Sequence, residues 1–296
     1  MTLSAPSDQT PRRLVTHNVV HLHLKPTRSA EMVSQTLIGH SVTVLEEQEG
    51  WARVQTDDTY RGWAETRWLS PDLGVAGLIS VITPFLEVRT KPQEDAPLVS
   101  RLSIGSRIVP VQRLGEGDGW DGWATVHLPS DLAATYYALA ASFPREMQHR
   151  DSFHLGTRAA EWATSFLGTP YLWGGSSSFG LDCSGFVQLC YRLAGITLRR
   201  DADIQREDPR FEPVAFDSLL PGDLVFFGKP DRITHVGMHS AGRTGDAGTF
   251  VHSAGGAGVI VSPWGDPMYS PGYVDARRLI PARASEPVTR HEAEDR

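Results

Sequence analysis

Two stretches in the first half of the chain repeat each other, and this repeat constrains the fold more than any other feature of the sequence. Three dipeptides recur in the same order at a constant offset of 66 residues, as the step from Lys25 to Lys91 shows. Three matches at one offset are not expected by chance, so the sequence predicts two copies of one structural unit. The pairs are Lys25-Pro26, Val33-Ser34 and Ile38-Gly39, recurring as Lys91-Pro92, Val99-Ser100 and Ile104-Gly105.

Each copy has the pattern of short β-strands. Apolar and polar residues alternate in segments such as 19–24 and 86–89, and Lys-Pro and Gly turns interrupt them. We predict two small β-barrels rather than one larger β-sandwich. Both copies end in Gly-Trp pairs: Gly50-Trp51 with Gly62-Trp63, and Gly119-Trp120 with Gly122-Trp123.

The Lys-Pro start and the Gly-Trp ending resemble bacterial SH3-like domains over roughly residues 12–130. The resemblance implies a first SH3-like domain at 12–72 and a second at 73–130. The segment that follows, which begins DLAATYYALAA, is rich in Ala and Leu. We predict a helical linker at 131–150.

The remainder of the chain has helices first and strands afterwards, which is an α+β order. The spacing predicts one helix over 158–167, ended by Gly168, and another over 183–194, ended by Gly195. Four later segments read as strands of one antiparallel sheet: 222–227, 234–240, 249–255 and 258–264. The polar residues 283–296 are expected to be a disordered tail.

Composition narrows the function classes. The chain has 296 residues and a formal net charge of −7, so it lacks the basic face that nucleic acid or an anionic membrane requires. It contains neither an apolar run of about 18 residues nor the apolar core of a secretory signal, so we expect a cytoplasmic protein. Its two cysteines, Cys183 and Cys190, are about 10 Å apart if they share one helix, too far for a disulfide, and are expected to be free thiols.

Cys183 stands where a helix is predicted to begin, after Asp182 as a candidate N-cap. The helix dipole and the unpaired amides at that end favour a thiolate, so we expect a lowered pKa and a nucleophilic role. A buried structural cysteine is the alternative. Cys190 lies two turns later on the apolar stripe and is expected to be a core residue.

The cysteine needs a base, and three of the eleven histidines lie in neighbouring predicted strands. His235, Gly237 and His239 share one face of a predicted strand, and the glycine between the two histidines leaves room for a neighbouring side chain. The returning strand places His252 opposite Gly237 and diagonal to His235. His252 is therefore predicted to orient His235, with His239 as the competing candidate.

Five ordered motifs, PYLWGG, LDCSGFV, PGDLVFF, THVGM and FVHSAG, resemble the NlpC-type cysteine peptidases, which are papain-like cell-wall hydrolases. The resemblance covers roughly residues 151–282. It implies Cys183 as nucleophile, His235 as general base and His252 as the residue that orients the base. It also implies an oxyanion site at the amide of Cys183, together with a donor from the 171–175 loop.

Two SH3-like domains ahead of such a peptidase resemble the γ-D-glutamyl-L-diamino acid endopeptidases, which process free wall peptides with an N-terminal L-Ala. This implies that Glu31 pairs with the substrate ammonium and that Tyr60 hydrogen-bonds nearby; the alternatives are a solvated turn residue and a sheet-surface aromatic. The resemblance assigns the remaining substrate contacts to Tyr171, Trp173, Asp182, Ser184 and Asp201.

Alternatives remain for several of these residues and for the function. Tyr171 and Trp173 are alternatively core aromatics, and Asp182 only a helix cap. The same cysteine also suits a peptidoglycan amidase or acyltransferase, and the whole chain a non-catalytic wall-peptide binding protein. No cofactor and no metal is expected, because the chain has none of the usual zinc-ligand spacings. The expected partner is a small peptidoglycan-derived peptide; the diamino acid, cleavage of intact peptidoglycan and the oligomeric state are left open.

Overall fold

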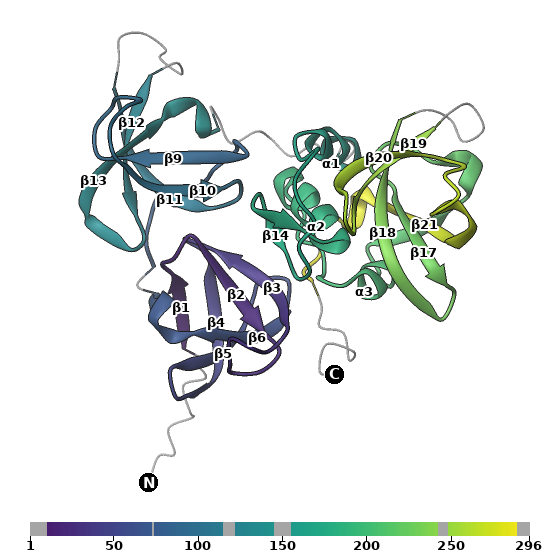
Figure 1. Cartoon of the computed structure of the whole chain (residues 1–296), viewed down its shortest axis with the longest axis horizontal. Helices are drawn as coiled ribbons and strands as arrows, with labels where there is room; N and C mark the ends of the chain where they lie inside the picture. The colour runs from purple at the N-terminus through teal and green to yellow at the C-terminus, as the bar shows by residue number, and fades with distance from the viewer. Residues whose placement is uncertain (1–10, 73, 115–121, 145–154, 242–247, 289–296) are drawn as a thin grey trace.

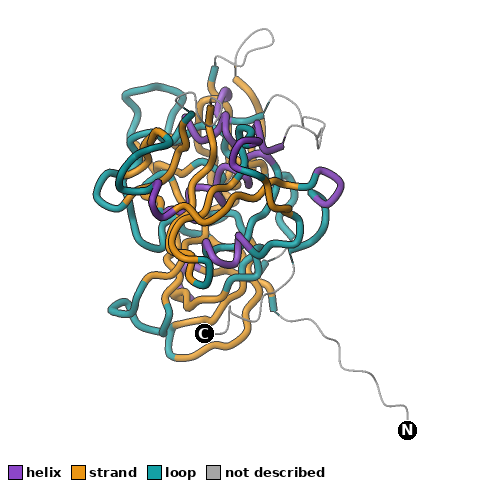
Figure 2. The backbone as a smooth tube through the Cα atoms, turned by 90° about the vertical axis from the view of Figure 1, so that its right-hand side faces the viewer, coloured by secondary structure: helices purple, strands orange, loops and turns teal. Residues whose placement is uncertain are grey.

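The structure is a computed structural model that describes residues 11–72, 74–114, 122–144, 155–241 and 248–288. Three folded units follow one another along the chain (Figure 1). Helices form a small part of the backbone, and strands and loops make up the rest (Figure 2). Within the described residues, no helix is both long and apolar enough to cross a membrane.

The first β-unit, residues 12–71, is a seven-stranded antiparallel sheet with the order β3-β2-β6-β5-β4-β1-β7. Buried and half-buried positions alternate in β5 and β6, so one face of the sheet supplies the core. The strands are β1 Arg12–Val15, β2 Val19–His23, β3 Met32–Leu37, β4 Ser41–Gln48, β5 Trp51–Gln55, β6 Arg61–Glu65 and β7 Leu69–Pro71.

The second β-unit, residues 79–143, has six strands in the order β10-β9-β13-β12-β11-β8. Apart from β7, this order matches that of the first β-unit strand for strand. The repeated Ile-Gly turn also matches, because Gly39 and Gly105 both adopt a left-handed backbone with φ of 80° and 82°. The strands are β8 Ile79–Ser80, β9 Phe85–Arg89, β10 Leu98–Ser103, β11 Arg107–Leu114, β12 Trp123–Leu128 and β13 Asp131–Leu139.

The predicted helical linker at 131–150 is wrong over its first part. Asp131–Leu139 is strand β13, which pairs with β12 and with β9 and so belongs to the second β-unit. Its Ala and Leu content favours a helix locally, but β9 would otherwise be left as an unpaired edge. Nonlocal pairing therefore decides the conformation here. The predicted domain limit at 130 moves to about 143, since Phe143 is buried in the same core; residues 145–154 of the predicted linker lie outside the described residues.

The third unit has helices α1 to α3 and a six-stranded antiparallel sheet with the order β16-β21-β17-β18-β19-β20. Helix α2 packs against α1 and against β18 and β19 of the sheet, around a core that contains Phe186 and Phe226. The four predicted strands are present. The elements are α1 Leu155–Thr164, α2 Cys183–Ala194, α3 Ala202–Arg206, β16 Phe211–Val214, β17 Leu224–Lys229, β18 Arg232–Ala241, β19 Thr249–Ala254, β20 Gly258–Pro263 and β21 Tyr273–Leu279, with a short ladder of β14 Ser176–Ser177 and β15 Gly180–Leu181.

Two predicted boundaries in this unit differ from the structure. The helix predicted over 158–167 lies at Leu155–Thr164 and is followed by a turn that reaches Gly168. The tail predicted to be disordered from 283 is folded in its first residues, where Arg283 donates to the carbonyl of Pro209 at 2.8 Å. Residues 289–296 lie outside the described residues.

Side-chain hydrogen bonds join the first β-unit to the third unit. The side-chain amide of Gln188 in α2 donates to Asp58 at 2.6 Å, and the amide of Ser176 donates to the Gln35 side chain at 2.9 Å. All four residues are buried. The first β-unit is therefore fixed against the helix that starts at Cys183.

Candidate active site

Cys183 is the first residue of α2 and is partly buried. The helix begins here because Asp182 has an extended backbone and its Oδ1 accepts a hydrogen bond from the amide of Gly185 at 2.7 Å. The first amides of a helix have no intrahelical partner, so the amide of Cys183 can serve a bound group. Cys190 is fully buried two turns later, in the core of the third unit.

A buried arginine, Arg200, holds this helix start in place. Its side chain is 1% exposed, and its guanidinium donates to both carboxylate oxygens of Asp182, at 3.0 and 2.6 Å. It also donates to Ser184 Oγ at 2.8 Å and to Ser34 Oγ of the first β-unit at 3.1 Å. Asp182 and Ser184 thus have structural partners within the protein, and their direct contact with substrate stays a prediction.

Sequence reasoning missed Arg200. The available signal was the pair of arginines, Arg199 and Arg200, directly before the predicted substrate residue Asp201. A charged side chain this far from solvent requires an opposite charge, and Asp182 was the acidic residue already placed at the site.

The thiol of Cys183 has a raised pKa, contrary to the expectation from its helix position. Burial raises it most and the charge of Asp182 raises it further, to about 11. Hydrogen bonds from the amides of Val236 and Ser184 and the charge of Arg200 act in the opposite direction but do not outweigh burial. At neutral pH the resting cysteine is therefore a thiol, and it must lose its proton to a base before it attacks.

His235 in β18 supplies a neutral imidazole to the cleft that Cys183 also lines. Burial, and then the charge of His252, lower its pKa to about 3, and burial lowers the pKa of His252 to about 4. His235 Nε2 lies 2.8 Å from His252 Nδ1, and His252 Nε2 lies 3.0 Å from Ser262 Oγ. With Nε2–H of His235 donating to His252, the Nδ1 atom of His235 is left to accept the thiol proton.

The geometry favours His252 over His239 as the partner of His235. His252 occupies the space above Gly237, where an added Cβ would lie 3.1 Å from the Cβ of His252. His239 instead accepts a hydrogen bond from Trp264 Nε1 at 3.2 Å. Ser262 in β20 was not predicted, and no local pattern marks it. No group of three or more His, Cys, Asp or Glu among the described residues is placed to hold a metal ion.

A cleft with a volume of about 540 Å³ runs past Cys183 and His235. Nine of the ten predicted site residues line it, and His252 lies behind His235. The cleft is walled by the first β-unit, by the segment before α2, by α3 and by the start of β18. The nine residues are Glu31, Tyr60, Tyr171, Trp173, Asp182, Cys183, Ser184, Asp201 and His235.

The first β-unit reaches the cleft through Glu31 and Tyr60. Glu31, exposed and next to the start of β3, accepts a hydrogen bond from Trp173 Nε1 at 2.7 Å. The hydroxyl of Tyr60 hydrogen-bonds the carboxylate of Asp201. Burial raises the pKa of Asp201 to about 6, although the charge of Arg200 and the bond from Tyr60 oppose the shift. These contacts cross between units that are far apart in the sequence.

Tyr171 and Trp173 are cleft residues rather than core aromatics. Trp173 is 62% exposed, and Tyr171 is partly buried beside Cys183. Burial, followed by the nearby charge of Cys183, raises the pKa of Tyr171 to about 12, so its hydroxyl keeps its proton at neutral pH. It can therefore donate a hydrogen bond into the cleft.

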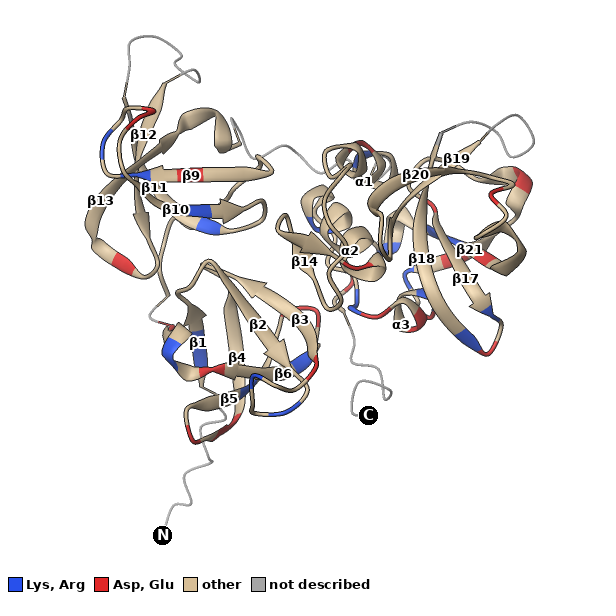
Figure 3. Cartoon of the chain, viewed as in Figure 1, with Lys and Arg blue, Asp and Glu red and all other residues tan. Residues whose placement is uncertain are grey.

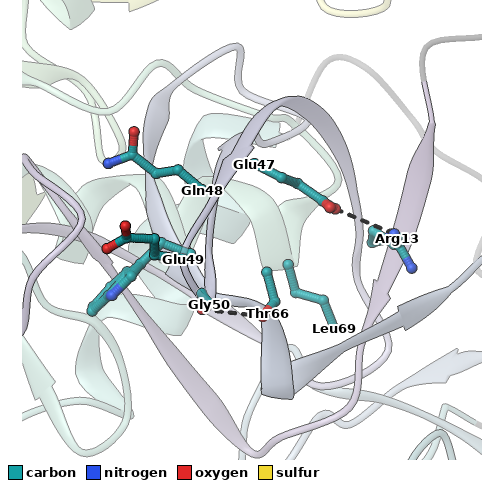
Figure 4. Close-up of a pocket in the computed structure, with 8 residues that line it drawn as sticks. Arg13, Glu47, Gln48, Glu49, Gly50, Thr66 and Leu69 are labelled. Atoms are coloured by element: carbon teal, nitrogen blue, oxygen red, sulfur yellow. Dashed lines mark hydrogen bonds and ion pairs between the residues drawn. The ribbon is translucent and has the colours of Figure 1, made fainter.

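A second hollow, with a volume of about 270 Å³, lies in the first β-unit at the β4–β5 hairpin (Figure 4). The ion pair between Arg13 and Glu47, at 3.2 Å, forms one side of it. None of the predicted site residues lines this hollow.

We expect the protein to lose stability in mild acid. The pKa values of His40 and His235 are lowered to about 3 and that of His252 to about 4, from 6.5 in an unfolded chain. Between pH 6.5 and about 4 the unfolded state therefore binds more protons than the folded state. The contribution of these groups to the free energy of unfolding is fully present above pH 6.5 and is lost as the pH falls towards 4. The raised pKa of Asp201 acts in the opposite direction below about pH 6, while burial also lowers the pKa values of His17 and His21.

Urea unfolding at steps from pH 7.5 to pH 4.5 measures this dependence. His40→Gln, outside the cleft, removes one of these histidines and should give a shallower decline of the free energy of unfolding. A free energy of unfolding that stays constant from pH 7 to pH 5 would contradict the prediction.

The profile of the NlpC/P60 family matches residues 168–278, which contain Cys183, His235 and His252. A probable endopeptidase NlpC homolog of Haemophilus influenzae is 31% identical over 140 residues, covering 47% of this chain and 71% of the homolog. The chain belongs to the NlpC/P60 family. This NlpC/P60 protein is thus a cysteine peptidase, and Cys183 and His235 line one cleft in it.

The N-terminal part of this NlpC/P60 peptidase is similar to known proteins as well. The profile of the bacterial dipeptidyl-peptidase Sh3 domain matches residues 22–69. A γ-D-glutamyl-L-lysine dipeptidyl-peptidase of Bacillus cereus is 28% identical over 279 residues, covering 86% of this chain and 77% of the relative. The crystal structure of an NlpC/P60 family protein from B. cereus superposes with a TM-score of 0.72 at 22% identity, covering 90% and 99% of the two chains. The likeness in structure extends over all three units.

Proposed function

We propose that this peptidase hydrolyses the γ-D-glutamyl-L-diamino acid bond of free peptidoglycan peptides that begin with L-Ala. The observation that carries the proposal is the composition of the cleft, in which Glu31 and Tyr60 of the first β-unit share one cavity with Cys183 and His235. The proposal includes the assignment of both β-units as SH3-like barrels and of the third unit as papain-like. Relatives named γ-D-glutamyl-L-lysine dipeptidyl-peptidase support it.

The reaction follows from the protonation states of the resting site. His235 Nδ1 takes the proton of the Cys183 thiol as the sulfur attacks the γ-carbonyl of D-Glu. The amide of Cys183 and the hydroxyl of Tyr171 donate hydrogen bonds to the oxyanion. His235 then gives the proton to the leaving amine, and a water molecule, deprotonated by His235, hydrolyses the acyl-enzyme.

The imidazolium that forms on His235 is stabilised by His252. Both rings are neutral at rest, so the new charge has no carboxylate beside it, but His252 Nδ1 accepts from Nε2–H of His235 at 2.8 Å. The hydroxyl of Ser262 accepts from the far nitrogen of His252, which fixes the tautomer. His252 is therefore a positioning residue for the base.

The free amine of the substrate is recognised by the first β-unit. An ammonium group that enters beside Glu31 and Trp173 meets a carboxylate that one indole N–H already orients into the cleft. An acetylated or sugar-linked N-terminus has no charge to pair with Glu31. The expected substrate class is therefore short, free wall peptides.

We expect Glu31→Gln to lower kcat/KM for L-Ala-γ-D-Glu-L-Lys by about 10- to 100-fold, because it removes the charge that pairs with the ammonium group. The wild type should cut the N-acetylated tripeptide no faster than Glu31→Gln cuts the free tripeptide. The variant should no longer discriminate between the free and the N-acetylated tripeptide. Mass spectrometry of the products measures both rates. Glu46→Gln, an exposed glutamate on β4 outside the cleft, is the matched control.

Equal cleavage of both peptides by the wild type would remove the role of Glu31 and leave the peptidase. No cleavage of either peptide would instead favour a different bond, such as that of an amidase, or a binding function.

A further inference from the structure

One cation that lines the cleft has no role in this reaction. Arg232 is the first residue of β18 and lines the cavity that contains Cys183 and His235. It belongs to the β17–β18 hairpin, which lies on the far side of α3 from the first β-unit (Figure 1). Figure 3 shows basic and acidic residues together at the tip of this hairpin. The lining of the cleft therefore includes Glu31 of the first β-unit and Arg232 of this hairpin.

A bulge in β18 turns Arg232 towards the cleft. The ladder pairs Phe227 with His235 but Gly228 with Ile233, so Thr234 is an extra residue. In a regular strand, side chains three residues apart face opposite sides of the sheet. The extra residue shifts this alternation, so the side chains of Arg232 and His235 face the same side.

Gly228 permits the bulge through its own backbone. Its φ is +132°, and a Cβ there would lie 2.5 Å from the carbonyl oxygen of Arg232.

The charge of Arg232 is available to a ligand. Its side chain is exposed, and among the described residues no carboxylate lies within ion-pair distance of it. Arg200 and Arg206, in contrast, are bound to Asp182 and Asp275. The other charged groups that line the cleft are acidic: Glu31, Asp182, Asp201 and Asp203.

The reaction decides which part of the substrate lies beside Arg232. His235 must protonate the leaving amine, so the leaving residue lies against the start of β18, while the acyl part extends towards Glu31. Resting on the proposed function, we propose that Arg232 is a specificity-determining residue that binds a carboxylate of the leaving diamino acid. The site thus selects peptides that end at, or carry a second carboxylate on, that residue.

The test compares wild type and Arg232→Gln on L-Ala-γ-D-Glu-L-Lys and on its C-terminal carboxamide. The wild type is expected to prefer the free carboxylate by about 10- to 100-fold in kcat/KM, as for loss of a charge-assisted hydrogen bond. Arg232→Gln should lower the rate on the carboxylate by that factor and change the rate on the carboxamide by less than about twofold. Lys229→Gln, which removes the exposed cation paired with Arg232 in the ladder, should leave both rates within about twofold.

Two further peptides distinguish the possible sources of the carboxylate. The first carries D-isoglutamine in place of D-Glu, so only the acyl-side carboxylate is lost. If the effect of Arg232→Gln on the rate disappears with this peptide, the assignment to the leaving side is overturned. The second has meso-diaminopimelate as the leaving residue with its α-carboxyl amidated, so the leaving residue keeps only its distal carboxylate. An effect of Arg232→Gln retained on this peptide assigns the distal carboxylate, and an effect lost assigns the α-carboxylate.

The outcomes separate the inference from the proposed function. Equal wild-type rates on carboxylate and carboxamide, together with no effect of Arg232→Gln on the diaminopimelate peptide, overturn the role of Arg232 while the peptidase stands. If the wild type cuts none of these peptides, the proposed function fails and the role of Arg232 fails with it. A thermal unfolding midpoint like that of the wild type shows that the exposed substitution has not disturbed the fold.

Discussion

Cys183→Ala is expected to lower hydrolysis of L-Ala-γ-D-Glu-L-Lys by roughly 10⁴-fold or more, because no other group at the site can form the acyl-enzyme. The sulfur receives hydrogen bonds from two backbone amides and shares the cleft with His235, and an alanine methyl group offers no nucleophile in its place. Single-turnover assays with mass spectrometry of L-Ala-D-Glu measure the loss.

Cys190→Ala is the matched control for this substitution. Cys190 lies on the same helix but is fully buried in the core, so its loss should cost about 1 kcal/mol of stability and leave the activity of the folded protein near that of the wild type. Activity that survives Cys183→Ala would mean that the thiol is not the nucleophile. Activity lost equally in both variants would mean that the assay reports folding rather than chemistry.

Local signals in the sequence were sufficient to locate the nucleophile helix. Asp182 as cap, the apolar spacing and Gly195 as the left-handed end give α2 its limits of Cys183 and Ala194, as the structure has them. Strand alternation likewise placed His252 opposite Gly237 and diagonal to His235, and the imidazoles of His235 and His252 are in contact. These features depend on residues that are close in sequence or joined by one short connection.

Features that depend on distant residues were predicted less well. Strand β13 has a helix-forming composition, and only its pairing with β9 and β12 makes it extended. The pKa of Cys183 was expected to be lowered from its helix position alone, but burial and the charge of Asp182 raise it. Neither effect can be read from a helix pattern, because both depend on what packs over the helix end.

The contribution of the first β-unit to the site came from resemblance and not from pattern. Glu31 and Trp173 are separated by 142 residues in sequence and are joined by one hydrogen bond. No periodicity relates a turn in a small sheet to a loop before a catalytic helix. Only the packing of the two units, through contacts such as that of Gln188 with Asp58, brings them together.

The second large effect is expected for Arg200→Met, which should lower the free energy of unfolding by about 3–5 kcal/mol. The variant leaves the carboxylate of Asp182 in a buried position with only backbone amides and Ser184 to compensate it. It also removes the hydrogen bond to Ser34 that ties the first β-unit to the helix start. Urea unfolding of the two proteins at pH 7.5 measures the difference.

Arg206→Met is the matched control, since it removes an arginine that is also bound to an aspartate, but near solvent. The side chains of Arg206 and Asp275 are 20% and 26% exposed, and loss of such a pair should cost about 1 kcal/mol or less. The double variant Asp182→Asn/Arg200→Met should be less destabilised than the sum of its single variants, because it no longer contains an unpaired buried charge. If Arg200→Met is no more destabilising than Arg206→Met, the buried pair does not hold the nucleophile helix, and the position of Cys183 must instead depend on the apolar packing of α2.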